Sequence, residues 1–253
     1  MKKQAIAFTV ASEENYPFAK QLESSLRKFH SEKELPLKII SGQTLHAHLG
    51  VDSKFMVRHT ATLAEDLIKE YELVIKIDCH SVITGKLDYV LNTTDYDVAT
   101  IRDYNRHEVP PYIGVGILPV DYMSTNFVAM RSEKFVHQWY VNCDTPQFER
   151  LQFKEQDVFN VICYFGNYNV RVLDDGDGVA KHYSYYGNAS RAFWPYMKVE
   201  KDTLVIPPDS MDKLRRLERD IRILNFRGQL GERINHNTKL SQEVIKYIEK
   251  LVK

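Results

Sequence analysis

The chain has 253 residues, of which 43 % are hydrophobic, and its 34 basic residues balance its 34 acidic residues. This size and hydrophobic content suit one α/β domain with a substantial core, and the zero net charge argues against a protein that binds nucleic acid through its phosphates. The three cysteines are widely spaced and form no Cys-x-x-Cys pair, which argues against a disulfide framework or a thiolate zinc site and favours a reducing compartment.

The hydrophobic pattern alternates between strands and helices, and its opening order of strand, helix and strand is typical of a parallel α/β sheet. The predicted elements, in chain order, are a strand at Ala5–Val10, a helix at 16–30, a strand at Leu37–Ile40, a helix at 54–71, a strand at Leu73–Ile77, a short helical turn at Leu87–Leu91, strands at Asp97–Ile101 and Phe127–Arg131, a helix capped by Ser132, a helix at 154–165, a strand at Val170–Leu173, strands at Thr203–Ile206 and Ile221–Phe226 around a charged helix near 209–220, and a helix at 240–252. Residues 102–122 and 174–200 are rich in glycine, proline and aromatic residues, and we expect irregular structure there.

No internal repeat or low-complexity linker divides the chain, so we expect one domain over residues 1–253. It would comprise a nucleotide-binding half at 1–101, a half for the donor sugar and the acceptor at 102–236, and a C-terminal helix at 237–253. The apolar stretch near the first residue is too short for a signal peptide, and no run of about 18 apolar residues follows, so we expect a cytoplasmic protein. The lysines of the terminal helix leave peripheral membrane contact as an alternative to packing on the domain.

The strongest local feature is the end of the third predicted strand, where Asp78-Cys79-His80 follows the apolar run Leu73–Ile77. Ligands bind beyond the carboxyl ends of strands in parallel sheets. Residues two apart in an extended chain point the same way, so Asp78 and His80 could both reach one metal ion whose coordination a diphosphate completes. The alternative is that Asp78 caps the following turn and His80 is a surface histidine.

From this point the order of motifs resembles that of the GT-A-fold glycosyltransferases, especially the glycogenin and lipopolysaccharide-galactosyltransferase type. In that family an apolar strand ends in Asp-x-Asp, which binds a divalent metal and the diphosphate of a nucleotide sugar. Asp78-Cys79-His80 stands at that place, with His80 replacing the second Asp, and Gly85-Lys86-Leu87-Asp88 is similar to the family's continuation. The resemblance implies a nucleotide-diphospho-sugar transferase fold with a mostly parallel central sheet flanked by helices.

Further motifs follow in the family's order. The run from Thr125 to Met130 resembles a strand whose Asn contacts the donor sugar, and Asn126 is the matching residue. The run Glu155-Gln156-Asp157 resembles the start of a helix whose acidic and amide side chains line the sugar pocket, so the resemblance implies catalytic roles for these three residues. The fold places the nucleotide base at the end of the first strand, which here is Val10-Ala11-Ser12, and the family often has a basic residue near the donor where Arg58 stands.

The last motif is Ile223 to Gly228, which resembles a late strand whose His ligates the metal, but Asn225 stands at the place of that His. The resemblance implies Mn²⁺ or Mg²⁺ as cofactor, bound by Asp78, His80 and Asn225. Asn is a poorer ligand than His for such a site, and His suits Mn²⁺ better than Mg²⁺. A metal-independent site is therefore the alternative, in which Arg227, beside Gly228, or Arg233 supplies positive charge to the leaving diphosphate.

The sequence thus predicts a glycosyltransferase that moves a sugar from a UDP- or GDP-sugar to a glycan, a lipid-linked sugar or a protein. One alternative is a sugar-phosphate nucleotidyltransferase, against which the acidic, glycine-free segment Ala11–Asn15 counts. Another is a non-catalytic carbohydrate-binding protein with the same fold, which the substitutions at His80 and Asn225 suggest. The donor nucleotide, the stereochemical outcome and the oligomeric state stay open at this point.

Overall fold

The computed structural model describes residues 2–41, 56–102, 122–144, 151, 154–173, 196–206, 219–226 and 240–253, with the backbone alone for residues 56–59. The helices and strands are β1 (Lys3–Ala11), α1 (Tyr16–Arg27), β2 (Leu37–Ser41), α3 (Met56–Glu70), β3 (Tyr71–Ile77), β4 (Ser81–Ile83), α4 (Asp88–Asn92), β5 (Val98–Arg102), β6 (Met123–Met130), α5 (Glu133–Cys143), α6 (Glu155–Phe165), β7 (Val170–Val172), β8 (Lys198–Glu200), β9 (Thr203–Ile206), β10 (Arg219–Asp220), β11 (Ile223–Asn225) and α8 (Gln242–Val252).

A six-stranded sheet in the order β2-β1-β3-β6-β5-β7 forms the centre of the molecule. β1 pairs in parallel with β2 and β3, and β5 pairs in parallel with β7, whereas β6 is antiparallel to both of its neighbours. Five strands therefore share one direction and β6 opposes them, which confirms the mostly parallel sheet. The carboxyl ends of β1 and β3 and the start of β6 consequently meet at one edge.

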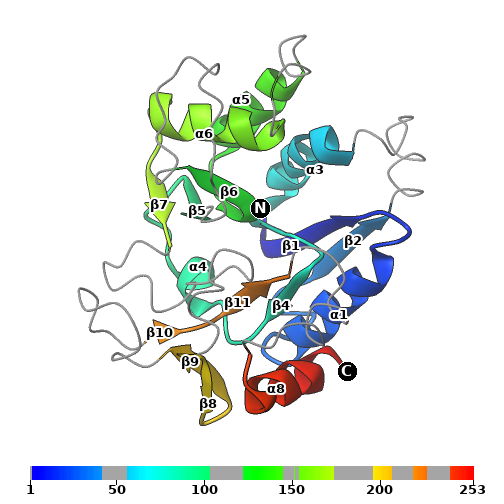
Figure 1. Cartoon of the computed structure of the whole chain (residues 1–253). Helices are drawn as coiled ribbons and strands as arrows, with labels where there is room; N and C mark the ends of the chain where they lie inside the picture. Colours follow the sequence, from blue (N-terminus) through cyan, green and yellow to red (C-terminus); the bar gives the residue numbers. More distant parts are fainter. Residues whose placement is uncertain are drawn as a thin grey trace.

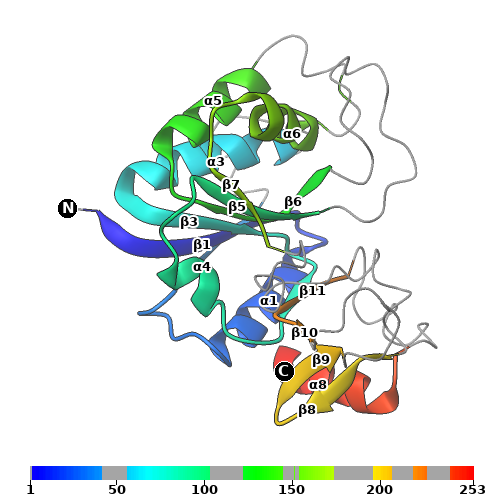
Figure 2. The ribbon, with the colours of Figure 1, turned by 90° about the vertical axis from the view of Figure 1, so that its left-hand side faces the viewer.

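Helices cover both faces of this sheet (Figures 1 and 2). α3, α5 and α6 lie on one face, where Phe8, Val74 and Val128 share a core with aliphatic side chains of α3 and with the buried aromatic rings of α5 and α6. α1 and α4 lie on the other face, over the strand residues that alternate with the first set. Because successive side chains of a strand point to opposite faces, the nearly continuous apolar runs of β1 and β3 supply both halves of the core.

Two smaller sheets extend the second face. β11 pairs antiparallel with β4, and β9 pairs with β8 and β10. α8 packs in this region and buries Val244, Tyr247, Ile248 and Leu251. The apolar side of α8 thus lies on the protein, as its packing alternative predicts. Of the helices in the described ranges, none combines the length and the apolar character that a membrane crossing requires.

Most predicted elements are confirmed, and the differences concern short or polar strands. β6 begins at Met123, four residues before the predicted start, because its polar Ser124 and Thr125 are buried and bond to neighbouring elements. β4 was not predicted, since three residues are too few to show a period. Residues 198–200 form a strand where irregular structure was expected. Residues 219–220 are a strand and not the end of a helix, and the rest of that predicted helix lies outside the described residues.

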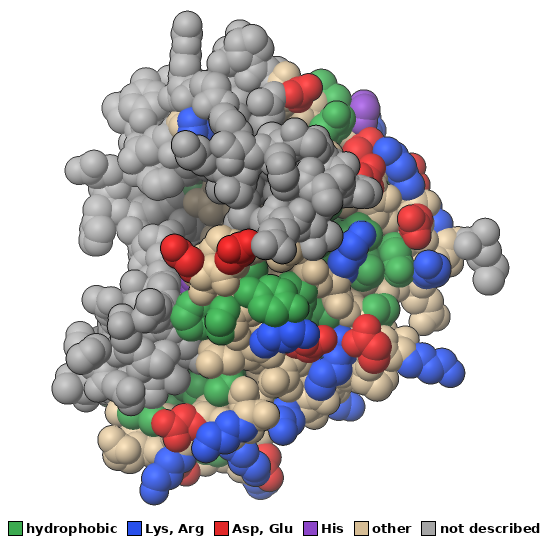
Figure 3. All heavy atoms as spheres, turned by 90° about the vertical axis from the view of Figure 1, so that its right-hand side faces the viewer, with side chains coloured by type: hydrophobic (Ala, Val, Ile, Leu, Met, Phe, Trp, Pro, Cys, Tyr) green, Lys and Arg blue, Asp and Glu red, His purple; other side chains and the backbone are tan. Residues whose placement is uncertain are grey.

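The described surface shows no separation of charge on the face seen in Figure 3, where basic and acidic side chains are interspersed. This agrees with the zero net charge of the chain. Cys79, Cys143 and Cys163 are all buried and free, in agreement with the expectation that the chain has no disulfide framework.

Candidate functional site

A bulge in β6 shapes the edge of the sheet beside Asp78. Along β5 the partner of Thr100 is Val128, but the partner of the next residue is Ser124, so residues 125–127 are unpaired on that side. The Thr100 hydroxyl closes the bulge by donating to the carbonyl oxygens of Ser124 at 2.8 Å and of Phe127 at 3.2 Å. Bulges often re-aim side chains next to ligand sites. Here the bulge carries Asn126, whose carbonyl oxygen accepts from the Asp78 amide at 2.7 Å.

The Asp78 carboxylate is the centre of a hydrogen-bond network. Its Oδ1 accepts from the backbone amide of His80 at 2.8 Å, from Nδ1 of the His80 ring at 3.1 Å, and from Nδ2 of Asn225 at 3.0 Å. Asn225 reaches it because β11 pairs with β4, which places Asn225 opposite Ser81. The structure therefore brings together three of the predicted residues from β11 and the end of β3, with Asn126 beside them.

The His80 ring is held on its other side by α1. Its Nε2 lies 3.2 Å from Oδ1 of Asn15, and its ring packs on Phe18 with 5.2 Å between the ring centroids. Asn15 and Phe18 were not among the predicted site residues. Their only sequence signal is their position just after the first strand, where the fold places donor contacts.

Burial and neighbouring charges shift the pKa of the Asp78 carboxyl group in opposite directions. Burial of Asp78 raises its carboxyl pKa, but the hydrogen bond from His80 and the positive charge of Lys76 outweigh it and hold the pKa at about 2. Asp78 is therefore an anion at neutral pH. Burial raises the pKa of the Cys79 thiol to about 12, and the negative charge of Asp78 adds to the effect, so this thiol stays protonated.

Lys76 is a third residue of the site that was not predicted from the sequence. It lies in β3 two residues before Asp78, is only 8 % exposed, and donates to the carbonyl oxygen of Thr125 in the bulge. A buried lysine is rare unless it is paired. A single charged residue inside the run Leu73–Ile77 was the signal that could have found it.

The start of α6 lies against the first half of β6. The Gln156 Oε1 accepts from the Thr125 amide at 3.0 Å, and Glu155 accepts from the Thr125 hydroxyl at 3.3 Å. Asp157 is fully buried and accepts from the hydroxyl of Tyr122. The three predicted sugar-pocket residues thus line the same stretch of β6 that carries Asn126, with their polar groups bonded within the protein.

The pKa of the Glu155 carboxyl group is strongly shifted by its surroundings. Burial raises its pKa from 4.5 to about 7, although the charge of Lys76 and the hydrogen bond from Thr125 oppose the rise. Lys76 therefore acts on the carboxyl groups of both Asp78, at the end of β3, and Glu155, at the start of α6.

The remaining predicted residues are placed only in part. Val10 and Ala11 end β1 at the same sheet edge, and the Ser12 hydroxyl accepts from the Asn15 amide at 3.3 Å. Arg58 belongs to α3 by its backbone, and its side chain lies outside the described part of the structure. Arg227 and Gly228 also lie outside it. The functional roles given to all of these residues stay predictions.

The potential ligand atoms around Asp78 and His80 show whether the divalent metal that the resemblance implies fits this site. Asp78, Cys79 and His80 bring three potential ligand atoms within 4.8 Å of one another. However, Oδ1 of Asp78 already accepts three hydrogen bonds, and Asn225 turns its NH₂ group toward it. Only Oδ2 of this carboxylate takes no hydrogen bond from the described residues. As they are arranged here, Asp78, His80 and Asn225 do not fit the metal site that the resemblance implies.

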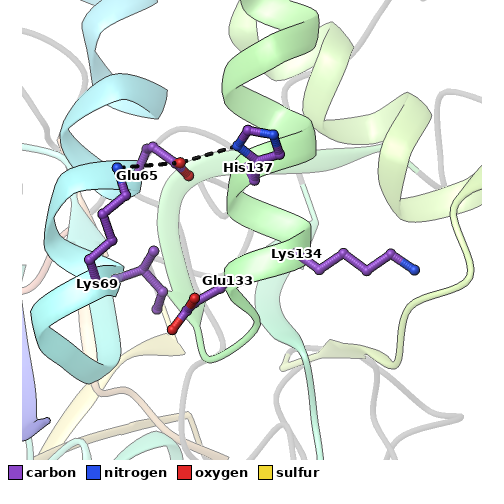
Figure 4. A pocket seen from close by; sticks show the side chains of 6 residues that line it. Glu65, Lys69, Glu133, Lys134 and His137 are labelled. Carbon is purple, nitrogen blue, oxygen red and sulfur yellow. Dashed lines mark hydrogen bonds and ion pairs between the residues drawn. The ribbon is translucent and has the colours of Figure 1, made fainter.

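A hollow of about 310 Å³ in the described part of the chain lies elsewhere, between α3 and α5. Glu65, Lys69, Glu133, Lys134 and His137 line it together with Ile68, and His137 bonds to Glu65 at 3.1 Å (Figure 4). It opens at the edge where β3 begins and β6 ends, which is opposite to Asp78. It is therefore separate from the candidate site.

Comparison with protein families finds no matching family model, and comparison with curated proteins finds no match. Among solved structures, an active-site mutant of LgtC has a TM-score of 0.63 at 11 % identity over 98 % of this chain and 95 % of its own. Galactosyltransferase LgtC with donor and acceptor sugar analogues gives 0.60 at 12 % identity, with the same coverage. A glycosyltransferase involved in glycosylation of the PBCV-1 major capsid gives 0.57 at 8 % identity, over 93 % of this chain and 99 % of that chain.

The glycosyltransferase GlyE of Streptococcus pneumoniae TIGR4 is also similar, with a TM-score of 0.54 and 14 % identity over 100 % of this chain and 60 % of that chain. These likenesses extend over nearly the whole chain, whereas the sequence identities are low. The chain therefore has the GT-A fold of these glycosyltransferases.

Proposed function

We propose that this protein is a glycosyltransferase that uses a UDP- or GDP-sugar as donor and a glycan, a lipid-linked sugar or a protein as acceptor. The observation that carries the proposal is the meeting of Asp78, His80, Asn126 and Asn225 at the carboxyl edge of β3, inside a GT-A sheet. Ligands of open α/β sheets bind at such edges. The LgtC structure with donor and acceptor sugar analogues supports the same class of substrates for this chain.

The roles follow from the charge that moves during the reaction. The bond between the anomeric carbon and the phosphate oxygen breaks, the sugar gains positive charge, and the nucleoside diphosphate leaves with added negative charge. We assign the diphosphate to the side of Asp78 and His80, with Arg58, Arg227 and Gly228 as further contacts. We assign the sugar to the side of Asn126 and the run Glu155-Gln156-Asp157, and the base to Val10-Ala11-Ser12.

The two alternatives predict different products. A nucleotidyltransferase would release pyrophosphate from a nucleoside triphosphate, and a non-catalytic relative would bind a glycan without turning over any donor. The acidic turn after β1 speaks against the first, because triphosphate binding needs cationic and glycine-rich backbone there. The cytoplasmic location also stays a proposal, which the three free cysteines support.

The test is binding and turnover of nucleotide sugars by the full chain. We expect one UDP- or GDP-sugar to stabilise it by about 2.7 kcal/mol when supplied at 100 times its Kd, and to be hydrolysed slowly with release of the nucleoside diphosphate. Asp78→Asn and Asn126→Ala should each weaken both effects. Glu249→Gln, on the exposed side of α8, is the matched control. If no common nucleotide sugar binds, or if Asp78→Asn behaves like the original chain, the proposal fails.

A further inference from the structure

We propose that the donor diphosphate is bound here without a divalent metal ion bridging it to Asp78, because hydrogen-bond donors occupy the positions at which a metal site needs acceptors. The inference rests on the proposed function. It is carried by the direction of the hydrogen bonds around Asp78 and by the charge of Lys76, both of which lie in the described part of the structure.

The hydrogen bond between Asn225 and Asp78 runs from the Asn225 amide group to the Asp78 carboxylate. A carboxylate oxygen only accepts hydrogen bonds, so the Asn225 atom that faces it at 3.0 Å is the amide nitrogen. The same nitrogen lies 3.1 Å from the Ser81 hydroxyl, and Asn225 is only 2 % exposed. Turning the amide over would set its oxygen against the Asp78 carboxylate in a buried place, where two facing acceptors are costly. Asn225 therefore offers hydrogens to this site and not a lone pair.

The contact between His80 and Asp78 also has a defined direction. Its Nδ1 faces the same carboxylate oxygen at 3.1 Å and so carries a hydrogen, which leaves no lone pair for a metal on that nitrogen. Its Nε2 is 3.2 Å from the Asn15 side chain, and Phe18 packs on the ring. To ligate a metal through either nitrogen, His80 would have to give up a contact that holds the ring in place.

Lys76 supplies the third argument. A pair of aspartates gives a GT-A metal site a formal charge of −2, whereas Asp78 alone contributes −1 here and Lys76 behind it contributes +1. Lys76 is buried in the same strand two residues before Asp78 and donates to the carbonyl oxygen of Thr125 in the bulge. The attraction of a dication to this site is therefore largely cancelled.

The first experiment titrates Mn²⁺ alone into the full chain, with electron paramagnetic resonance of free Mn²⁺ as the readout. We expect no binding that depends on Asp78: the original chain and Asp78→Asn should give the same curve. The double variant His80→Asp with Asn225→His restores the family's ligand types, and it should bind Mn²⁺ at least about tenfold more tightly than the original chain. Mn²⁺ binding by the original chain that disappears in both Asp78→Asn and His80→Ala would overturn the inference. Far-ultraviolet circular dichroism checks that each variant is folded.

The second experiment measures the Kd of UDP and of GDP in Mn²⁺ and in a chelator. We expect the two conditions to agree within about threefold for the nucleotide that binds. A gain of about tenfold or more in Mn²⁺ that is lost in Asp78→Asn would overturn the inference and leave the proposed function standing. If neither nucleotide binds in either condition, the proposed function fails and the inference about its diphosphate fails with it, and the Mn²⁺ titration then decides only whether Asp78 belongs to a metal site.

Discussion

Replacement of Glu155 by glutamine should change how the stability of the protein depends on pH. Glu155 is 8 % exposed, and its pKa in the folded chain is about 7 against an ordinary 4.5. Because the folded-state pKa is the higher one, the folded chain binds the proton of Glu155 more tightly than the unfolded chain does. The contribution to stability is complete below pH 4.5 and is lost as the pH rises through about 7.

The size of the effect follows from the two pKa values. The interval from 4.5 to about 7, at about 1.4 kcal/mol for each pH unit, gives about 3 kcal/mol. Glutamine keeps the shape of the side chain and has no proton to lose. We therefore expect Glu155→Gln to gain about 3 kcal/mol of unfolding free energy on the original chain between pH 4.5 and pH 8.

Urea unfolding, followed by the fluorescence of the fully buried Trp139, measures this difference at a series of pH values. The test uses only how the difference in unfolding free energy between the two chains changes with pH. A difference that is the same at every pH reflects the new amide group and not the titration of Glu155. Glu249→Gln, whose side chain is exposed on α8, should show no such trend. If the difference between Glu155→Gln and the original chain is flat from pH 4.5 to pH 8, burial does not disfavour the Glu155 anion and the reasoning is refuted.

Three further changes test other parts of the structure. Lys76→Met removes the charge that lowers the pKa of Glu155, so the pH trend above should move to higher pH, and an unchanged midpoint would contradict the assigned contact. Gly85→Ala would place a methyl group 2.5 Å from the Arg222 guanidinium, and we expect urea unfolding to show a loss of about 1–2 kcal/mol, whereas full stability would show that Arg222 moves freely. Trp139→Phe removes the donor that bonds to the Glu155 carbonyl oxygen at 3.0 Å, which should cost about 1 kcal/mol or more. Because this variant lacks the Trp139 fluorescence, its urea unfolding is followed by far-ultraviolet circular dichroism, and a neutral result would mean that the carbonyl finds another donor.

The long elements of the fold could be predicted because their patterns repeat over several turns or residues. α1 places Leu22 and Leu26 four residues apart on its buried side, and β3 is an apolar run of the length of one strand. The strands β4, β8 and β10 were not predicted, because they have only two or three residues and, unlike the equally short β7 and β11, do not lie in a longer run that reads as a strand. The strand geometry of β4 comes from β11, which is distant in sequence, whereas β8 pairs with β9, which follows it closely in the chain.

At the site, the order of motifs was enough to expect Asp78, His80, Asn126 and Asn225 as neighbours, and the structure places them side by side. The direction of each hydrogen bond was not predictable. Asn15 meets His80 across 65 positions of sequence, and an asparagine in a sequence does not reveal which end of its amide faces a carboxylate. The difference matters, because a reading by residue type favours a metal site and the orientation of the amide opposes it.

The bulge in β6 has a consequence for how such a protein can change over evolutionary time. The strand is held in two separate registers, Val128 to Met130 against the core and Met123 to Ser124 beside the candidate site, with three unpaired residues between them on the β5 side. An insertion or deletion among those three residues would leave the pairing of Val128 with Thr100 in place, but it would act on Asn126 and on Phe127, which pairs with Ile77 of β3 on the other side. Changes in chain length at this bulge would therefore reshape the edge of the sheet beside Asp78, while the pairing of residues 128–130 with β5 holds the strand in the core.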